Sequence, residues 1–494
     1  MLKESIESIC LSQFAEKNLT KFGTSGLRGL NTALTDKVCY VYTVAFLQYL
    51  EEVQLLKPGS YIQLAGDLRI NTDHILKVIQ QAILDKGYLI NYCGKIATPA
   101  LAYSSLTQQQ PGMMVTGSHI PDNMNGIKFY KATGEILKRD ELRILKQVVH
   151  LSNDLFNENG VIQKEVQPLR EINTQAANNY CERYQDFFPK NALEKMRIGV
   201  YAHSSVAIPV LVTILQSLGA AVILFGDAKQ FHSIDTEALT QNDIDIAKKY
   251  LIKQQLDVIV SADGDGDRPL LTDEQGCWLP GDILGMLTAI ILKAEYIVVP
   301  ISCNSSIDYL PQFKKIIRSK IGSPFVIEKM DELLAAGCQK VMGYEANGGV
   351  LLGSDFGELK ALPTRDSALP MLCLLNYVNQ QKIKISDLVK KYCRVYTVSN
   401  SIKGISTEKT QVLLNTLSQD GKIIQDFFAI KACVKNIDRL DGLRIYFDNQ
   451  EVIHLRPSGN APELRVYTEA STLLLAKKLN DLCTIILKCR VGKA

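Results

Sequence analysis

Short apolar runs alternate with amphipathic stretches through most of the chain. Residues 61–98 open on an apolar run, continue as an amphipathic stretch and close on a second apolar run, and residues 197–227 repeat this order. Residues 296–330 follow it again, with a basic helix-like stretch in the middle and G-S-P-F-V-I as the second run. Each unit is typical of a strand, a polar loop, a helix and a second strand. The weak repeat therefore predicts three similar mixed α/β domains, with parallel strands joined by right-handed crossovers.

A further short apolar strand follows each unit and ends in an unusual polar loop. These strand–loop segments cover residues 112–119, 256–268 and 339–349. Ligands of open α/β sheets bind at the carboxyl ends of the strands, so loops at equivalent positions of similar units are expected to meet in one cleft. Because every α/β protein has polar loops after its strands, the chemistry of these loops has to decide whether they form a site.

The last hundred residues have a different pattern. Residues 367–392 are expected to be helical, and residues 443–447, 452–455 and 464–468 are short apolar runs linked by turns. A helix-like run over residues 471–487 follows them. This pattern predicts a smaller α+β domain at the C-terminal end. The expected domain limits are 1–165, 166–277, 278–390 and 391–494.

Composition narrows the class of protein. The chain has 494 residues, of which 46% are hydrophobic and 22% charged, and its formal net charge is +3. These values are typical of a globular protein and give no reason to expect a nucleic-acid or membrane surface. The first residues lack an uninterrupted apolar segment, and no run approaches the ~18 apolar residues of a membrane span. The 12 cysteines are scattered without a C-x-x-C pair, which favours reduced thiols in the cytoplasm over a disulfide framework or a zinc site.

The segment D-G-D-G-D-R, residues 263–268, carries the strongest chemical signal. Three carboxylates at alternate positions, separated by glycines, can turn inward on one hard cation. A calcium EF-hand loop is the competing interpretation, but its sixth position requires glycine and here is Arg268, and a strand pattern precedes the loop. Magnesium is therefore favoured, and Arg268 is suited to an anion beside the metal.

A serine ends the apolar run G-M-M-V-T-G-S-H. Ser118 could be an ordinary helix N-cap, whereas Pro121 and the Asn125-Gly126 pair indicate a longer loop. His119 and Lys128 supply charge or proton-transfer partners, although Lys128 could also be a surface residue. Facing a metal loop, a serine of this kind could carry a phosphoryl group as a covalent relay.

Three other segments contain weaker signals. Y-E-A-N-G-G, residues 344–349, offers a carboxylate and an amide that suit vicinal sugar hydroxyls, with an Asn-Gly turn as the alternative. R-P-S-G-N-A-P-E-L-R, residues 456–465, combines two arginines, a hydroxyl and exposed backbone N–H groups in the pattern of an anion cradle, with a plain turn as the alternative. K-F-G-T-S-G-L-R-G, residues 21–29, is a glycine-rich segment with cationic ends that include Arg28.

Together these motifs resemble the α-D-phosphohexomutase family, which contains bacterial phosphomannomutases and phosphoglucomutases. The resemblance covers nearly the whole chain, in the family's order and at about its spacing. It rests on G-T-S-G-L-R-G, T-G-S-H-I-P-D-N-M-N-G-I-K, D-G-D-G-D-R, G-Y-E-A-N-G-G and R-P-S-G-N-A-P. The family implies three α/β domains and a C-terminal α+β domain around a central cleft.

The resemblance also assigns roles to residues. Ser118 would be phosphorylated and, with Asp263, Asp265 and Asp267, would hold Mg²⁺. Catalysis would use Ser118, His119, Lys128 and Arg28. Substrate would be bound by Arg268, Glu345, Asn347, Arg456, Ser458, Gly459, Asn460 and Arg465.

The reaction that the family implies moves phosphate between the 6- and 1-hydroxyls of a hexose. A hexose 1,6-bisphosphate would serve as intermediate and activator, and the only expected partner is the hexose phosphate. A cytoplasmic monomer or homodimer that feeds nucleotide-sugar synthesis would fit this context, with neither nucleic acid nor membrane as a partner.

Five departures from the family pattern bear on which sugar is used. The positions concerned are Ile120, Pro324, Asn347, Gly349 and the pair Asn460-Ala461. Mannose is favoured, with glucose and glucosamine phosphates as alternatives of the same chemistry. A non-catalytic sugar-phosphate binder or calcium module is the alternative of a different class, and Ser118, the three aspartates and Arg456 argue against it.

Overall fold

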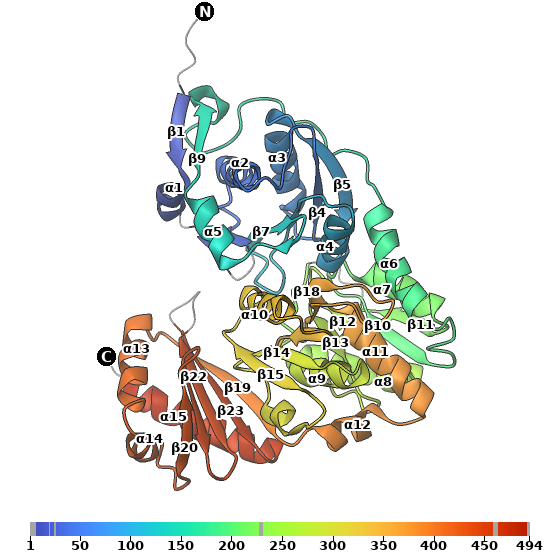
Figure 1. Ribbon diagram of the computed structural model, residues 1–494, viewed down its shortest axis with the longest axis vertical. Coiled ribbons are helices and arrows are strands. Elements are labelled where there is room, and N and C mark those ends of the chain that lie inside the picture. Colours follow the sequence, from blue (N-terminus) through green and yellow to red (C-terminus); the bar gives the residue numbers. More distant parts are fainter. Residues whose placement is uncertain (1–5, 19, 24–25, 227–230, 458–462, 492–494) are drawn as a thin grey trace, which may run out of the picture. The chain divides into compact units, whose positions relative to one another are not determined.

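The computed structural model describes residues 6–18, 20–23, 26–226, 231–457 and 463–491 (Figure 1). The chain forms two compact units, one made of residues 1–294 and 322–386, the other of residues 295–321 and 387–494. Among the described residues, no helix combines the length and the apolar character that a bilayer crossing requires.

The first sheet of the first unit has the order β2-β3-β7-β6-β4-β5, with β8 beside β7. Strands β4, β5 and β6 run parallel, whereas β7 runs antiparallel to both β6 and β3. The strands are β2 (Lys21–Phe22), β3 (Gly26–Leu30), β4 (Tyr61–Gly66), β5 (Leu89–Lys95), β6 (Gly112–Val115), β7 (Met124–Lys131) and β8 (Gly134–Glu135).

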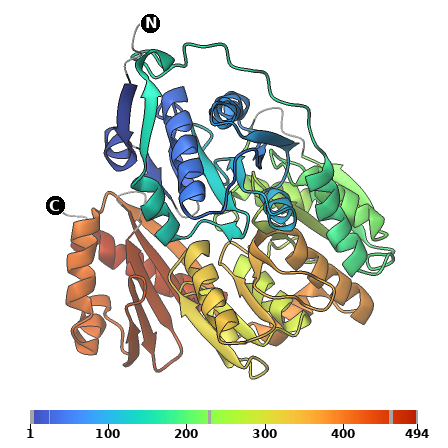
Figure 2. The ribbon, with the colours of Figure 1, turned by 45° about the horizontal axis from the view of Figure 1, so that its top comes forward.

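Helices cover this sheet because their apolar faces need burial. In α2 (Asp36–Glu52), the Thr35 hydroxyl accepts a hydrogen bond from the backbone N–H of Val38 and caps the first turn. The ring of Phe46 lies 4.8 Å from that of Phe129 on β7, centroid to centroid. Strands β1 (Ile6–Cys10) and β9 (Val148–Ser152) pair antiparallel and lie side by side in Figures 1 and 2. The other elements here are α1 (Leu11–Lys17), α3 (Thr72–Asp85), α4 (Thr98–Thr107), α5 (Lys138–Leu145) and the 3₁₀ turn η1 (Asn153–Leu155).

The second sheet has the order β11-β10-β12-β13. Strands β10, β11 and β12 are parallel, and β13 returns antiparallel to β12 with Ser261 opposite Leu270. The loop between these two strands is the acidic segment 263–268. The elements are α6 (Gln175–Phe187), β10 (Arg197–Tyr201), α7 (Ile208–Ser217), β11 (Ala221–Phe225), α8 (Gln241–Gln254), β12 (Val258–Ala262) and β13 (Pro269–Leu271).

Three antiparallel strands and three helices complete the first unit. Tyr344 on β16 pairs with Val350 on β17, so that residues 345–349 form the loop between them. The elements are α9 (Gly281–Ile291), α10 (Ser323–Ala335), β16 (Val341–Tyr344), β17 (Val350–Leu352), β18 (Leu362–Asp366) and α11 (Ala368–Gln381), and α12 (Ile385–Tyr392) continues across the limit between the units.

The second unit contains an antiparallel sheet of order β19-β23-β22-β21-β20 and the parallel strands β14 and β15. Buried apolar residues of the sheet, such as Ile445 and Leu455, share a core with Leu487 of the last helix. The elements are β14 (Tyr296–Pro300), the 3₁₀ turn η2 (Ser305–Tyr309), β15 (Lys315–Ser319), β19 (Tyr396–Lys403), α13 (Thr407–Leu417), α14 (Gly421–Phe428), β20 (Val434–Asp438), β21 (Leu443–Phe447), β22 (Val452–Pro457), β23 (Glu463–Ala470) and α15 (Leu473–Val491).

The expected fold class is confirmed, with mixed α/β sheets and a C-terminal α+β part. The expected parallel strands are present in the first two sheets, and β7 and β13 return antiparallel beside the strands that precede the polar loops.

The assignment within residues 296–330 is wrong. The basic stretch is strand β15, and G-S-P-F-V-I opens helix α10. Pro324 occupies the first turn of that helix, where its missing N–H costs nothing, and Gly322 before it has a φ of 126°. Both features favour a helix start, whereas the isoleucines of the basic stretch suit a strand.

Candidate active site

Ser118 lies in the loop between β6 and β7, residues 116–123, called here the serine loop. Its side chain is buried and its backbone φ is 53°, in the left-handed region that few non-glycine residues occupy. The hydroxyl donates a 2.7 Å hydrogen bond to Oδ2 of Asp263, and lies 3.3 Å from Nδ1 of His119. Strand β7 follows the loop, so the helix N-cap interpretation of Ser118 is wrong. Backbone strain of this kind is typical of functional loops.

Arg69 holds the serine loop in this conformation. Its guanidinium donates four hydrogen bonds of 2.5–3.0 Å to backbone carbonyls, those of Ser118, Ile120 and Pro121 in the loop and that of Met124 at the start of β7. Its Nε lies 3.2 Å from a carboxylate oxygen of Asp67, and its guanidinium carbon lies 4.7 Å from the centroid of the Phe231 ring. A buried guanidinium can orient several carbonyls at once because its donors form a rigid planar fork.

Replacing Arg69 by methionine is expected to lower the free energy of unfolding by about 2–4 kcal/mol, because it leaves the buried loop carbonyls without a donor. Urea unfolding measures this change. The matched control is Arg197→Met, which removes an exposed arginine that also donates to two backbone carbonyls and should cost less than about 0.5 kcal/mol. Equal losses in the two variants would contradict the assigned role of Arg69.

The acidic loop, residues 263–268, brings three buried carboxylates together. One oxygen each from Asp263, Asp265 and Asp267 lies within 4.8 Å of the others. Oδ1 of Asp265 and Oδ1 of Asp267 have no hydrogen-bond partner among the described residues. Unpartnered buried carboxylate oxygens are costly, so these atoms fit a hard divalent cation with oxygen ligands.

Glycine makes the tight acidic loop possible. Gly266 has a φ of 74°, and a Cβ there would lie 2.6 Å from Cβ of Ala207. On the other side of the loop, Oδ1 of Asp263 accepts the backbone N–H groups of Asp267 and Arg268 at 3.1 Å each. The loop therefore has little freedom to move its carboxylates apart.

Two carboxyl groups of the acidic loop have pKa values that are shifted in opposite directions by their surroundings. Burial and the charges of Asp265 and Asp267 raise the pKa of Asp263 well above its ordinary value. Burial acts in the same direction on Asp267, but Arg365, Lys128 and Arg268 together hold its pKa below the ordinary value. The three carboxylates thus repel one another, and a cation between them would relieve that repulsion.

Cationic side chains surround the acidic loop. Nζ of Lys128, on β7, lies 2.6 Å from Oδ2 of Asp265 and 2.5 Å from Oδ2 of Asp267. Although burial acts to lower it, these two charges raise the pKa of Lys128. Burial and the charges of Arg268 and Arg365 lower the pKa of Arg28 on β3 to about 10.

Arg268 and His119 complete the group. Arg268 is buried, yet its guanidinium approaches carboxylate oxygens of the described residues only at 3.7–3.9 Å, longer than hydrogen bonds. Burial and the charges of Arg268 and Arg28 lower the pKa of His119 well below its ordinary value. The imidazole is therefore uncharged at neutral pH and can accept a proton.

The loop of residues 345–349, called here the glutamate loop, contains the expected sugar-binding residues. Oε2 of Glu345 accepts a 3.1 Å hydrogen bond from Nη1 of Arg365. Oδ1 of Asn347 accepts the backbone N–H of Gly349 at 3.0 Å, and Thr236 donates to the Asn347 carbonyl. The turn closes tightly on α9, because a Cβ on Gly281 would meet backbone atoms of the loop at 2.3–2.5 Å.

The residues expected to hold a distant phosphate lie in the second unit. Arg456 on β22 pairs in register with Arg465 on β23. Two like charges directly opposite each other are unfavourable unless an anion joins them. Nε of Arg456 donates a 2.9 Å hydrogen bond to Oδ1 of Asp441, whose Oδ2 accepts the N–H of Ile321 at 2.9 Å. Ser458, Gly459 and Asn460 lie outside the described residues.

Most predicted site residues of the first unit are brought together by the fold. Ser118, His119, Lys128, Arg28 and Arg268 interact with the acidic loop or with one another. Glu345 joins them through Arg365, a residue that the motifs did not indicate. The only signal for Arg365 was a charged residue within the otherwise ordinary strand pattern L-P-T-R-D, and such residues often lie on a solvated face.

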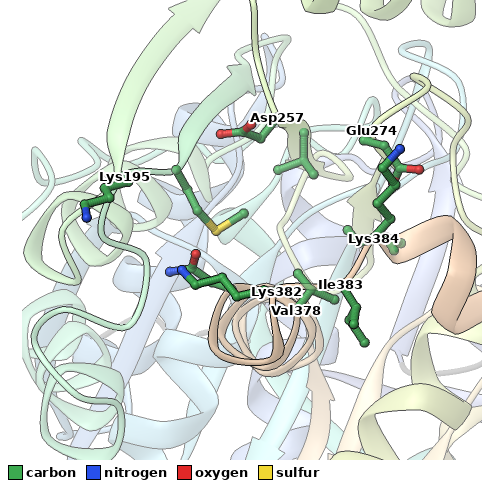
Figure 3. Close-up of a pocket in the computed structure, with 11 residues that line it drawn as sticks. Lys195, Asp257, Glu274, Val378, Lys382, Ile383 and Lys384 are labelled. Carbon is green, nitrogen blue, oxygen red and sulfur yellow. The ribbon is translucent and has the colours of Figure 1, made fainter.

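A separate pocket of about 340 Å³ lies away from this chemistry. Figure 3 shows Lys195 and Lys384 on opposite sides of it, with Lys382 and Val378 of the α11 region between them. Asp257, another lining residue, precedes β12, whereas the acidic loop follows the other end of that strand. Its carboxylate accepts the backbone N–H of Arg197, and the other lining carboxylate, Glu274, accepts hydrogen bonds from Ser386.

Four domain models of one protein family match the chain along most of its length. The models describe phosphoglucomutase/phosphomannomutase, with α/β/α domain I at residues 19–154, domain II at 178–276, domain III at 280–396 and the C-terminal domain at 410–482.

Named relatives align with the chain over more than nine-tenths of its length. A phosphomannomutase of Salmonella muenchen is 41% identical over 97% of this chain and 98% of its own. A phosphomannomutase of Sinorhizobium fredii is 38% identical over 91% of this chain and 95% of its own. A phosphoglucosamine mutase of Clostridium botulinum is more distant, at 29% identity over 91% of this chain and 94% of its own.

Solved structures share the fold. A phosphoglucomutase/phosphomannomutase family protein from Burkholderia thailandensis has a TM-score of 0.72 at 18% identity, over 96% of this chain and 98% of its own. The Aspergillus fumigatus N-acetylphosphoglucosamine mutase, in complex with GlcNAc-6P and magnesium, has a TM-score of 0.57 at 13% identity, over 98% of this chain and 100% of its own.

Proposed function

Since the chain belongs to the phosphoglucomutase/phosphomannomutase family and is a phosphohexomutase, we propose that it interconverts mannose 6-phosphate and mannose 1-phosphate. The preference for mannose is supported by the two phosphomannomutases at 41% and 38% identity, against 29% for the phosphoglucosamine mutase. Glucose and glucosamine phosphates are the alternatives, because the acidic loop treats all hexose phosphates alike.

One observation carries the proposed mechanism: the Ser118 hydroxyl lies 2.7 Å from a carboxylate of a buried acidic triad. Phosphorylated Ser118 donates its phosphoryl group to the free hydroxyl of the sugar phosphate. The bond between phosphorus and Oγ breaks, a bond from phosphorus to the sugar oxygen forms, and a hexose 1,6-bisphosphate results. After this intermediate turns around, its other phosphate returns to Ser118.

The donor set of the acidic loop fits Mg²⁺. Asp263, Asp265 and Asp267 would hold it together with an oxygen on Ser118, and the unpartnered oxygens of Asp265 and Asp267 support this proposal. Bound Mg²⁺ supplies positive charge that stabilises the oxygens of the transferring phosphoryl group.

The surrounding side chains bind and orient the reactants. Arg268, Arg28 and protonated Lys128 attract the phosphoryl oxygens. Of the two residues expected to take the proton of the attacking hydroxyl, the uncharged His119 is the one able to accept it. Glu345 and Asn347 hydrogen-bond the sugar hydroxyls. Arg456 and Arg465, with Ser458, Gly459 and Asn460, grip the phosphate that does not react.

Several expectations accompany this proposal. We propose four domains with limits 1–165, 166–277, 278–390 and 391–494, a cytoplasmic enzyme that is a monomer or homodimer, and a role in nucleotide-sugar synthesis. Ser118 carries the phosphoryl group in the active form, and hexose 1,6-bisphosphate restores it after accidental loss.

Assays with mannose, glucose and glucosamine 6-phosphates, each primed with hexose 1,6-bisphosphate and Mg²⁺, test the substrate. We expect kcat/KM for mannose 6-phosphate to exceed the other two at least about tenfold, because hydrogen bonds to sugar hydroxyls discriminate strongly. A preference for either other sugar would replace mannose in the proposal. Binding without turnover of all three would contradict the mutase mechanism itself.

A further inference from the structure

Arg365, on strand β18, joins the acidic loop to the glutamate loop. Its side chain is 4% exposed. Nε and Nη2 donate hydrogen bonds of 3.0 and 2.8 Å to one oxygen of Asp267, its Oδ2. Nη1 donates to Oε2 of Glu345 at 3.1 Å. One guanidinium thus spans two buried carboxylates that come from different parts of the first unit.

Neighbouring residues on both sides confine the Arg365 guanidinium and its stem. Nη1 also lies 3.4 Å from Oγ of Ser323, and Ser323 donates a 2.9 Å hydrogen bond to Oε2 of Glu135 on β8. Thr364, next to Arg365, donates to the other oxygen of Glu135. On the opposite side, a Cβ on Gly349 would lie 2.6 Å from Cγ of Arg365, so the glutamate loop packs directly on the arginine stem.

The bonds of Arg365 decide which carboxylate oxygens remain available. Because Oδ2 of Asp267 is occupied, the oxygen left without a hydrogen-bond partner is Oδ1, which fits a metal ligand. Because Oε2 of Glu345 is occupied, its Oε1 is left to meet a sugar hydroxyl. Each carboxylate presents one defined atom instead of two interchangeable ones.

We infer that Arg365 is a positioning residue that aligns the metal ligand Asp267 and the sugar-binding Glu345 together, so that metal affinity and sugar recognition depend on one side chain. The inference rests on the proposed function for the roles of these two carboxylates. Lysine cannot replace arginine here, since a single ammonium lacks the planar fork that reaches both carboxylates.

The test compares Arg365→Lys and Arg365→Met with the wild-type enzyme. Calorimetric titration with Mn²⁺ as a probe for the divalent site is expected to show about 10-fold to 100-fold weaker binding in both variants, as loss of outer-shell support usually does. The ratio of kcat/KM for mannose 6-phosphate over glucose 6-phosphate should fall in parallel. Arg183→Met, a buried arginine that contacts the Lys360 carbonyl and Tyr103 instead, should change neither quantity.

A double-variant cycle tests the coupling itself. Glu345→Gln should weaken Mn²⁺ binding when Arg365 is present, because one of the two anchors of the arginine then loses its negative charge, and should have no further effect in Arg365→Met. If both arginine variants fail to fold, Ser323→Ala keeps both carboxylate bonds of Arg365 and removes the 3.4 Å contact together with the hydrogen bond from Ser323 to Glu135. We expect this variant to weaken Mn²⁺ binding about twofold to threefold.

Folded Arg365 variants with wild-type Mn²⁺ affinity and unchanged sugar preference would overturn the inference, as would additive effects in the double-variant cycle. Failure of the proposed function is distinguishable from this outcome, because it would appear as absent turnover in the wild-type enzyme, whereas the Mn²⁺ titrations do not require turnover.

Discussion

Ser118→Ala is expected to lower kcat at least about 10⁴-fold, because removal of a covalent nucleophile eliminates the step on which the others depend. The fold should persist, since the variant removes one hydroxyl and leaves the four hydrogen bonds of Arg69 to the serine loop and to Met124. Intact-mass analysis after incubation with hexose 1,6-bisphosphate should show one added phosphoryl group on the wild-type protein and none on the variant.

Ser104→Ala is the matched control for the serine variant. Ser104 is also buried, and its hydroxyl has no hydrogen-bond partner among the described residues, but it lies on α4 outside the cluster around the acidic loop. This variant should keep both turnover and the added phosphoryl group. An added phosphoryl group that survives Ser118→Ala would place the relay on another residue and refute the mechanism.

Asp265→Asn is expected to lower kcat/KM about 10³-fold and to abolish stabilisation by Mg²⁺. Oδ2 of Asp265 accepts hydrogen bonds from Lys128 and Thr98, which an amide oxygen can still accept, so the loop should keep its shape. The substitution removes the negative charge of Asp265, and hard cations bind a charged carboxylate more strongly than a neutral amide. In the wild-type protein, Mg²⁺ should raise the midpoint of thermal unfolding because it binds the folded state, and in the variant it should not.

Asp245→Asn provides the control for the charge change, since Asp245 accepts a hydrogen bond from Gln241 on helix α8, away from the acidic loop. Its response to Mg²⁺ and its turnover should equal those of the wild-type protein. Should Asp265→Asn keep wild-type turnover under chelation, the metal assignment of the acidic loop would be wrong.

The acidic and serine loops could be identified from sequence because their local composition already demands a special environment. Three aspartates separated by glycines are unfavourable without a cation, whichever fold surrounds them. The prediction for residues 315–327 was wrong because a short apolar run suits a strand or a buried helix equally well, and Pro324 in the first turn favours the helix.

The sequence by itself determined the order of the motifs, the α/β character of the chain and the type of chemistry, since each depends on residues that are near one another along the chain. Only the tertiary structure decided that Arg69 orients the carbonyls of the serine loop and that Arg365 joins Asp267 to Glu345. Arg365 is 98 positions from Asp267, and local sequence cannot show which buried charges will meet across such a distance. Those contacts arise when packed strands bring polar groups out of water, where each buried charge must find a partner.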